Sequence, residues 1–146
     1  MSSEFLGTWE NSVNKKRIMI PAELKKKFGP NAKNSVICSF GPDAYIVVYP
    51  LDNWKKLSEK LRKGDERQRD LLNDLRDFAS PEQSIEGPGR IKLTDELMEL
   101  AGITDKVVIR GEGDFISVWS PEEFRRVKLE RLESRKGKFR KTDYQL

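Results

Sequence analysis

The 146-residue chain contains no histidine and a single cysteine, Cys38. Without histidine, the commonest general base and metal ligand at neutral pH is missing. One cysteine cannot form an intrachain disulfide, so a reducing compartment is its natural setting. Because there is no Cys/His cluster, we expect no zinc site. Cys38 stands in an apolar run, which favours a small core side chain.

Long hydrophobic runs and nucleotide-binding motifs are also absent. No apolar stretch approaches the ~20 residues that cross a bilayer, and the N-terminus has no signal-peptide pattern. Gly111 and Gly113 are a lone glycine pair between two expected strands, where a hairpin turn explains them. No isolated carboxylate pair suggests acid/base catalysis. We therefore expect a cytoplasmic protein that is not an enzyme, with no cofactor, metal, small-molecule substrate or membrane partner.

Positive charge is concentrated in two segments. The chain is 36% apolar and 36% charged, with a net charge of +4 and a pI near 9.2. Residues 121–146 hold nine Lys/Arg against five Asp/Glu, and residues 10–34 hold seven basic residues against two acidic ones. A localised basic patch fits an anionic partner, usually nucleic acid. The alternative is a pair of solvated charged faces.

The chain repeats itself. Residues 5–21 (FLGTWENSVNKKRIMIP) read as strand, basic turn, strand, and residues 85–93 (IEGPGRIKL) repeat that pattern. An offset of 73 maps residues 17–20 onto 90–93, and an offset of 70 maps residues 45–49 onto 115–119. One shortened loop explains the change of offset. Agreement in residue type over such a length indicates an internal duplication.

Each copy reads strand, turn, strand, short helix, strand, turn, strand, helix. Because one copy is too small to bury both faces of a sheet, we expect the two copies to interleave their hairpins, close a small barrel and share one core. The predicted fold is mainly β with short helices (α+β), arranged as a pseudo-dimer. The expected layout is a first unit at 4–57, a connecting helix at 58–79, a second unit at 80–124 and a basic C-terminal helix and tail at 125–146. Asp52 is the expected N-cap of the helix that leads into the connector, which Gly64 interrupts.

The two turns carry the functional signal. Arg17 and Arg90 end them at equivalent positions. An arginine fork can pair with guanine in the major groove or bind phosphate, and the flanking lysines suit phosphate. The alternative is that each arginine pairs with a nearby carboxylate. The predicted DNA contacts are Lys15, Lys16, Arg17 and Arg90, and the residues predicted to shape the turns are Asn14, Glu86, Gly87 and Gly89.

In their order and spacing, several segments resemble the MraZ family. They are FLGTWENSV, RIMIPAEL, YIVVYPLDNW, GRIKL with the later LMELAGI, and FISVW, and they cover residues 5 to about 124. The resemblance implies two AbrB-like (SpoVT-AbrB) swapped-hairpin units in a nucleoid-associated regulator of the cell-division and cell-wall gene cluster. It further implies homo-oligomeric rings that present D-x-x-x-R turns to repeated elements of double-stranded promoter DNA.

Both turns depart from the D-x-x-x-R pattern. The second reads E-x-x-x-R from Glu86 to Arg90, and the first reads N-x-x-R from Asn14 to Arg17. The first turn is one residue shorter and has no glycine, which limits access to positive φ. Either Asn14 still caps the turn while the lysines raise phosphate affinity, or base reading is altered and only the ring scaffold remains. A different class of function is an antitoxin-type protein–protein module; a hydrolase is a third, which the absence of histidine disfavours.

Overall fold

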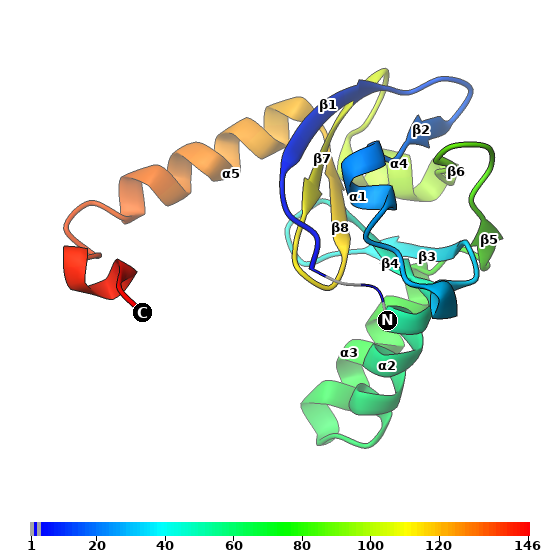
Figure 1. Ribbon diagram of the computed structural model, residues 1–146, viewed down its shortest axis with the longest axis horizontal. Helices are drawn as coiled ribbons and strands as arrows, with labels where there is room; N and C mark the ends of the chain where they lie inside the picture. Colours follow the sequence, from blue (N-terminus) through cyan, green and yellow to red (C-terminus); the bar gives the residue numbers. More distant parts are fainter. Residues whose placement is uncertain (1, 3) are drawn as a thin grey trace.

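The computed structural model describes residue 2 and residues 4–146, which form two antiparallel sheets and several helices (Figure 1). The larger sheet has the strand order β1-β7-β8-β4-β3-β5, and the smaller one pairs β2 with β6. The strands are β1 Thr8–Ser12, β2 Arg17–Met19, β3 Ser35–Phe40, β4 Ile46–Pro50, β5 Gln83–Ser84, β6 Arg90–Lys92, β7 Lys106–Gly111 and β8 Ile116–Trp119. The helices are α1 Ala22–Lys25, α2 Leu51–Arg62, α3 Glu66–Phe78, α4 Asp95–Ala101 and α5 Pro121–Ser134, with short 3-10 turns η1 Pro30–Ala32 and η2 Lys141–Tyr144.

The predicted α+β class is confirmed, but the sheet does not close into a barrel. In the described part of the chain, β1 and β5 are its two edges. To close a barrel, edge strand β5 would have to pair with edge strand β1, and β5 is only two residues long. The β2–β6 pair, called the ribbon below, instead covers one face of the sheet. There Ile18, Ile20, Ile91 and Leu93 join the same buried cluster as the inward-facing sheet residues.

The strand pairing shows how the two copies interlock. β1 pairs with β7 and β5 pairs with β3, so the first strand of each copy joins the third strand of the other. In the ribbon Ile18 faces Ile91, its counterpart at the offset of 73. Between β4 and β8, Val47 faces Ser117, its counterpart at the offset of 70. Where a residue pairs with its own counterpart, a two-fold axis passes between them. The two copies are therefore related by a pseudo-two-fold axis and form a pseudo-dimer, as expected.

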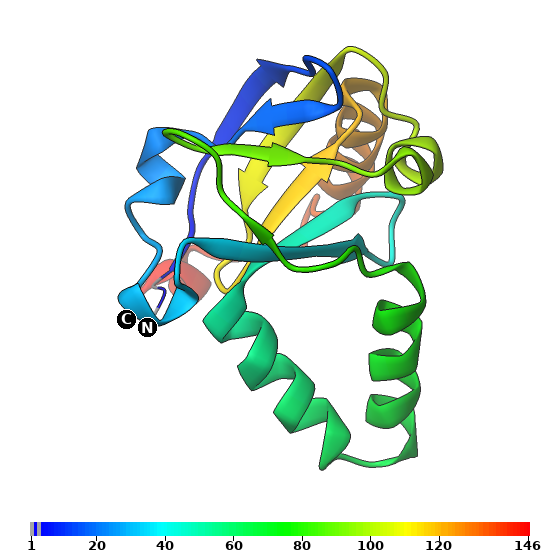
Figure 2. The same ribbon diagram turned by 90° about the vertical axis from the view of Figure 1, so that its right-hand side faces the viewer.

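Helices α2, α3 and α5 cover the other face of the sheet, whereas α1 and α4 pack on the ribbon side. Strand residues that alternate with the inward set, such as Val47, Tyr49 and Val108, form a second cluster with Leu61 of α2, Leu75 of α3 and Val127 of α5. Such alternation is expected because successive side chains of a β-strand point to opposite faces of the sheet. Figure 2 shows α2 and α3 as a helical hairpin below the sheet, and Figure 1 shows α5 reaching away from the body.

The start of α2 differs from the expectation. The helix begins at Leu51, after an N-cap position at Pro50 that has no side-chain hydrogen bond. Asp52 therefore lies in the first turn, where a carboxylate favours the positive end of the helix dipole. Its Oδ1 accepts a 2.9 Å hydrogen bond from Ser2 Oγ. Asp52 thus ties the N-terminus to α2 instead of capping the helix.

Candidate nucleic-acid interface

The ribbon brings the two predicted turns together. Because β2 pairs with β6, Arg17 faces Lys92 and Met19 faces Arg90 across it. Two further backbone bonds of 2.8 Å tie each turn to the other copy, from Ile20 N to Gly89 O and from Leu93 N to Lys16 O. Because each turn precedes its own strand and the two strands are antiparallel, the turns lie at opposite ends of the ribbon, on one side of the molecule (Figure 2).

The first turn is a two-residue hairpin loop. Asn14 and Arg17 exchange both backbone hydrogen bonds, Asn14 N to Arg17 O at 2.9 Å and Arg17 N to Asn14 O at 3.0 Å. Between them Lys15 and Lys16 have φ of +51° and +64°. Positive φ at both central residues is typical of a type I′ turn, whose twist matches that of a hairpin. The lysines thus adopt, without glycine, a conformation that costs on the order of 1 kcal/mol or more per residue.

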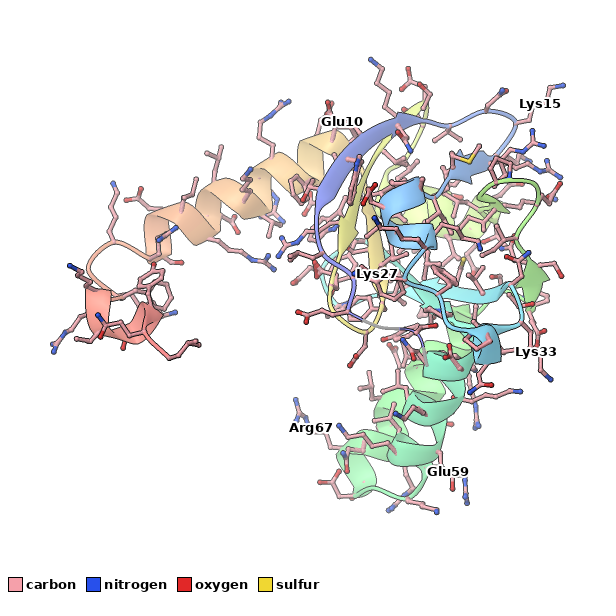
Figure 3. All side chains as sticks on the ribbon, in the orientation of Figure 1. Glu10, Lys15, Lys27, Lys33, Glu59 and Arg67 are labelled. Carbon is pink, nitrogen blue, oxygen red and sulfur yellow. The ribbon has the colours of Figure 1, made fainter. Side chains whose placement is uncertain are left out.

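Lys15 lies at the tip of this hairpin and points away from the body (Figure 3). Lys27, after α1, and Lys33, after η1, lie on other parts of the surface. The basic residues of the 10–34 segment therefore do not form one patch, and the positive charge of the first turn comes from residues 15–17 alone.

The second turn has a three-residue loop between Glu86 and Arg90. Gly89 N and Arg90 N both donate to Glu86 O, at 3.2 and 2.8 Å, and Glu86 N donates to Arg90 O at 2.8 Å. Gly87 has a φ of +52°, which glycine adopts without strain. A Cβ added to Gly89 would lie 2.8 Å from Ile20 O, so the ribbon leaves no room for a side chain there.

The four predicted DNA-contacting side chains fall into two pairs. Lys16 Nζ lies 2.8 Å from Asp95 Oδ1, and Arg17 Nε lies 3.1 Å from Glu86 Oε1. Lys15 and Arg90 are exposed, and no carboxylate among residue 2 and residues 4–146 forms an ion pair with either. The expected alternative of an arginine–carboxylate pair therefore applies to Arg17 and not to Arg90.

The turn-shaping residues act through their backbones. Asn14 and Glu86 close the two turns with main-chain N–H and C=O groups, as given above. The carboxylate of Glu86 accepts from the Arg17 guanidinium of the other turn. Neither side chain bonds a backbone N–H of its own turn within the described residues.

Two amide side chains at equivalent positions hold the ribbon, and the sequence reasoning missed them. Asn11 Nδ2 donates to Met19 O at 2.8 Å, and Gln83 Nε2 donates to Lys92 O at 2.8 Å. Gln83 Oε1 also accepts from Lys92 N at 2.8 Å. The sequence held a signal that these two residues are equivalent: Asn11 and Gln83 each stand three residues before the residue that opens a turn.

A metal-binding cluster and a reactive thiol are two features through which the described residues could carry chemistry. No group of three or more His, Cys, Asp or Glu side chains among them could hold a metal ion. Burial raises the pKa of the Cys38 thiol to about 12, so it stays protonated at neutral pH and is a poor nucleophile. No helix in the described ranges is both long and apolar enough to cross a bilayer.

Comparison with known proteins agrees with this architecture. The family model described as "MraZ protein, putative antitoxin-like" matches residues 5–74. "Transcriptional regulator MraZ" of Natranaerobius thermophilus is 32% identical over 123 residues, covering 82% of this chain and 83% of the relative. The protein of that name from Syntrophomonas wolfei subsp. wolfei is 33% identical with the same coverage. That of Lactobacillus delbrueckii subsp. bulgaricus is 30% identical over 133 residues, covering 89% of this chain and 90% of the relative. The chain belongs to the MraZ family.

Proposed function

We propose that this protein is a DNA-binding transcriptional regulator that recognises repeated promoter elements of the cell-division and cell-wall gene cluster through its two basic turns. The main support is the β2–β6 pairing, which places Arg17 and Arg90 on one ribbon. Relatives of similar length are named transcriptional regulators, a role that involves no catalysis. The cytoplasm, in association with the nucleoid, is the location this role requires.

The ribbon suits a DNA groove. A two-stranded ribbon fits the ~12 Å width of the major groove, and here the turns at its two ends carry Lys15, Lys16, Arg17 and Arg90. Phosphate contacts by the lysines would set the register, and an arginine fork would read a guanine edge. Asn14, Glu86, Gly87 and Gly89 would set the shape of the two turns that present these groups.

The division of the chain follows from the same proposal. Residues 4–57 and 80–124 are the two AbrB-like units, residues 58–79 connect them, and residues 125–146 form a basic appendage. The connector contains the end of α2 and all of α3. α3 opens with a capping box between Asp65 and Gln68, which stabilises its start.

We further propose that copies of the chain assemble into a ring through the C-terminal arm, residues 121–146. Leu129 and Leu132 on α5 are 59% and 46% exposed, and Phe139 and Tyr144 beyond it are 51% and 67% exposed. The arm borders a hollow of about 1050 Å³ whose apolar lining includes Trp119, Phe124 and Val127. Exposed apolar surface of this kind marks an interface, and a symmetric assembly would repeat the ribbon at intervals that match repeated DNA elements.

The proposal is tested by binding of fluorescent DNA from upstream of the protein's own gene, against a scrambled duplex, over a range of salt concentrations. Preference for the cognate duplex and a log–log salt slope of ~0.9 per phosphate contact support DNA reading. Equal, weak binding to both duplexes refutes it.

Light scattering of the wild type and of the double variant Leu129→Glu/Leu132→Glu tests the ring. The wild type should be a closed oligomer and the variant smaller, whereas a monomeric wild type refutes the ring.

The antitoxin-type alternative draws on the same exposed arm. If the arm binds a different protein, a pull-down after nuclease treatment should retain one partner in stoichiometric amount, and the Leu129→Glu/Leu132→Glu variant should lose it. That result, together with a monomeric wild type and no DNA preference, would favour a protein–protein module.

A further inference from the structure

We propose that the two arginines of the ribbon have different tasks: Arg90, together with Lys15, contacts DNA, whereas Arg17 is a positioning residue held across the two turns by Glu86. This inference rests on the proposed DNA-binding function and assigns the work within that site.

The first observation is the position of Glu86. By the backbone bridges, Glu86 opens the second turn and Asn14 opens the first, each opposite the arginine that ends its own turn. Glu86 does not pair with Arg90 of its own turn; its Oε1 accepts from Nε of Arg17 at 3.1 Å. The pair spans 69 residues of sequence and links the two copies.

The second observation is that the reciprocal pair is missing. Under the pseudo-two-fold axis, the counterpart of the Glu86–Arg17 pair joins residue 14 to Arg90. Residue 14 is asparagine, which carries no charge. The guanidinium of Arg90 accordingly has no ion-pair or hydrogen-bond partner among residue 2 and residues 4–146. One amide in place of a carboxylate therefore leaves one arginine free and the other engaged.

The engaged arginine is held at two points. Besides its bond to Glu86, Arg17 Nη1 lies 3.5 Å from Lys15 O, a weak contact with the backbone of its own turn. Its side chain is 37% exposed. The Glu86 carboxylate occupies Nε and places a negative charge beside the guanidinium, which weakens its attraction for a DNA phosphate.

The charge distribution reinforces the difference. Lys16 and Arg17 are balanced by Asp95 and Glu86, so the uncompensated positive charge of the two turns belongs to Lys15 and Arg90, with Lys92 on the ribbon between them. An exposed guanidinium with all its N–H donors available can make the bidentate contact with guanine O6 and N7 that distinguishes bases. Arg90 is thus the residue equipped to read sequence, and the cross-turn pair fixes the geometry from which it does so.

The test compares variants that change no net charge with variants that do. Arg17→Gln/Glu86→Gln removes the pair and leaves the net charge unchanged; by loosening the frame that positions Arg90 it should lower cognate binding by ~3-fold and keep most of the preference over the scrambled duplex. Arg90→Gln should lower cognate binding by ~10–100-fold and reduce the preference over the scrambled duplex. Equal losses for the two variants would overturn the inference while the DNA-binding function stood. A wild type without cognate preference would instead refute that function.

A second comparison restores the missing carboxylate. Asn14→Glu should engage Arg90 and lower cognate binding by at least ~5-fold, whereas Asn14→Gln, its uncharged match, should not. General repulsion of DNA by the new charge is distinguished by repeating Asn14→Glu in the Arg90→Gln background. There its effect should disappear if it acts through Arg90. An effect of the same size in both backgrounds would contradict the assignment. Thermal midpoints of all variants show whether each is folded.

Discussion

The close approach of Gly89 to the other copy gives a sharp test of the interlocked ribbon. Gly89 O accepts the 2.8 Å hydrogen bond from Ile20 N, and a Cβ on Gly89 would lie 2.8 Å from Ile20 O. Its φ lies outside the left-handed region, so the obstacle is space and not backbone strain. Lys16 makes the equivalent bond, to Leu93 N, and carries a side chain with its φ at +64°.

In Gly89→Ala the new methyl group has to move the Ile20 carbonyl or the turn by several tenths of an ångström. Overpacking of this kind destabilises the fold by about 1–3 kcal/mol. Alanine also lowers the conformational entropy of the unfolded chain relative to glycine, which offsets about 0.4–1 kcal/mol of that loss. A net loss of about 1–2 kcal/mol in the free energy of unfolding follows, or roughly 2–8 °C in Tm for a chain of this length.

The assay is thermal and urea unfolding at one fixed protein concentration, because assembly would shift the midpoints. Gly113→Ala is the matched control. Gly113 has a φ of +86° and nothing within 4 Å of its added Cβ, so that variant measures backbone strain without a clash. A Gly89→Ala protein as stable as wild type would refute the close contact between Gly89 and the end of β2.

Three further outcomes follow from the same structure. Ile91→Ala, at the axis of the ribbon and fully buried, should cost about 2–5 kcal/mol in urea unfolding, whereas a change under about 1 kcal/mol would contradict its burial. Cys38, whose pKa burial raises to about 12, should resist a thiol reagent in the native protein at pH 8 and react in urea; since the folded pKa lies above the unfolded one, this group's stabilising contribution is full below about pH 8.5 and declines as pH rises toward 12. Asp65→Ala removes the bond that Asp65 Oδ1 accepts from Gln68 N at 2.9 Å and should cost about 0.5–2 kcal/mol, seen first as faster proteolysis of the α2–α3 hairpin.

The duplication was the most informative feature of the sequence. The two offsets predicted which segments are equivalent, and the structure pairs two of those equivalents, Ile18 with Ile91 and Val47 with Ser117, on its axis. Composition and turn residues placed the strands because β-branched runs bounded by Gly, Pro and Asn are local signals. Closure of the barrel was wrong, since it depends on the length of β5 and on how far the sheet curves, which no local pattern encodes.

The contacts that define the candidate site lay beyond sequence reasoning. Glu86 and Arg17 are 69 positions apart, and their pairing depends on the exchange of hairpins between copies. Read alone, each turn suggests a carboxylate or amide that supports its own loop. Only the ribbon geometry shows that Glu86 serves the opposite turn.

The energetics explain how the two turns can differ without loss of the fold. Exposed ion pairs such as Arg17–Glu86 contribute about 0–1 kcal/mol, whereas each buried ribbon side chain, such as Ile18 or Ile91, is worth several times more. The stability of the ribbon is therefore set by its apolar face and its backbone bonds, which both copies keep. The turn side chains are free to vary at little thermodynamic cost, and one such change, asparagine at position 14, is enough to make a symmetric frame present two unlike arginines.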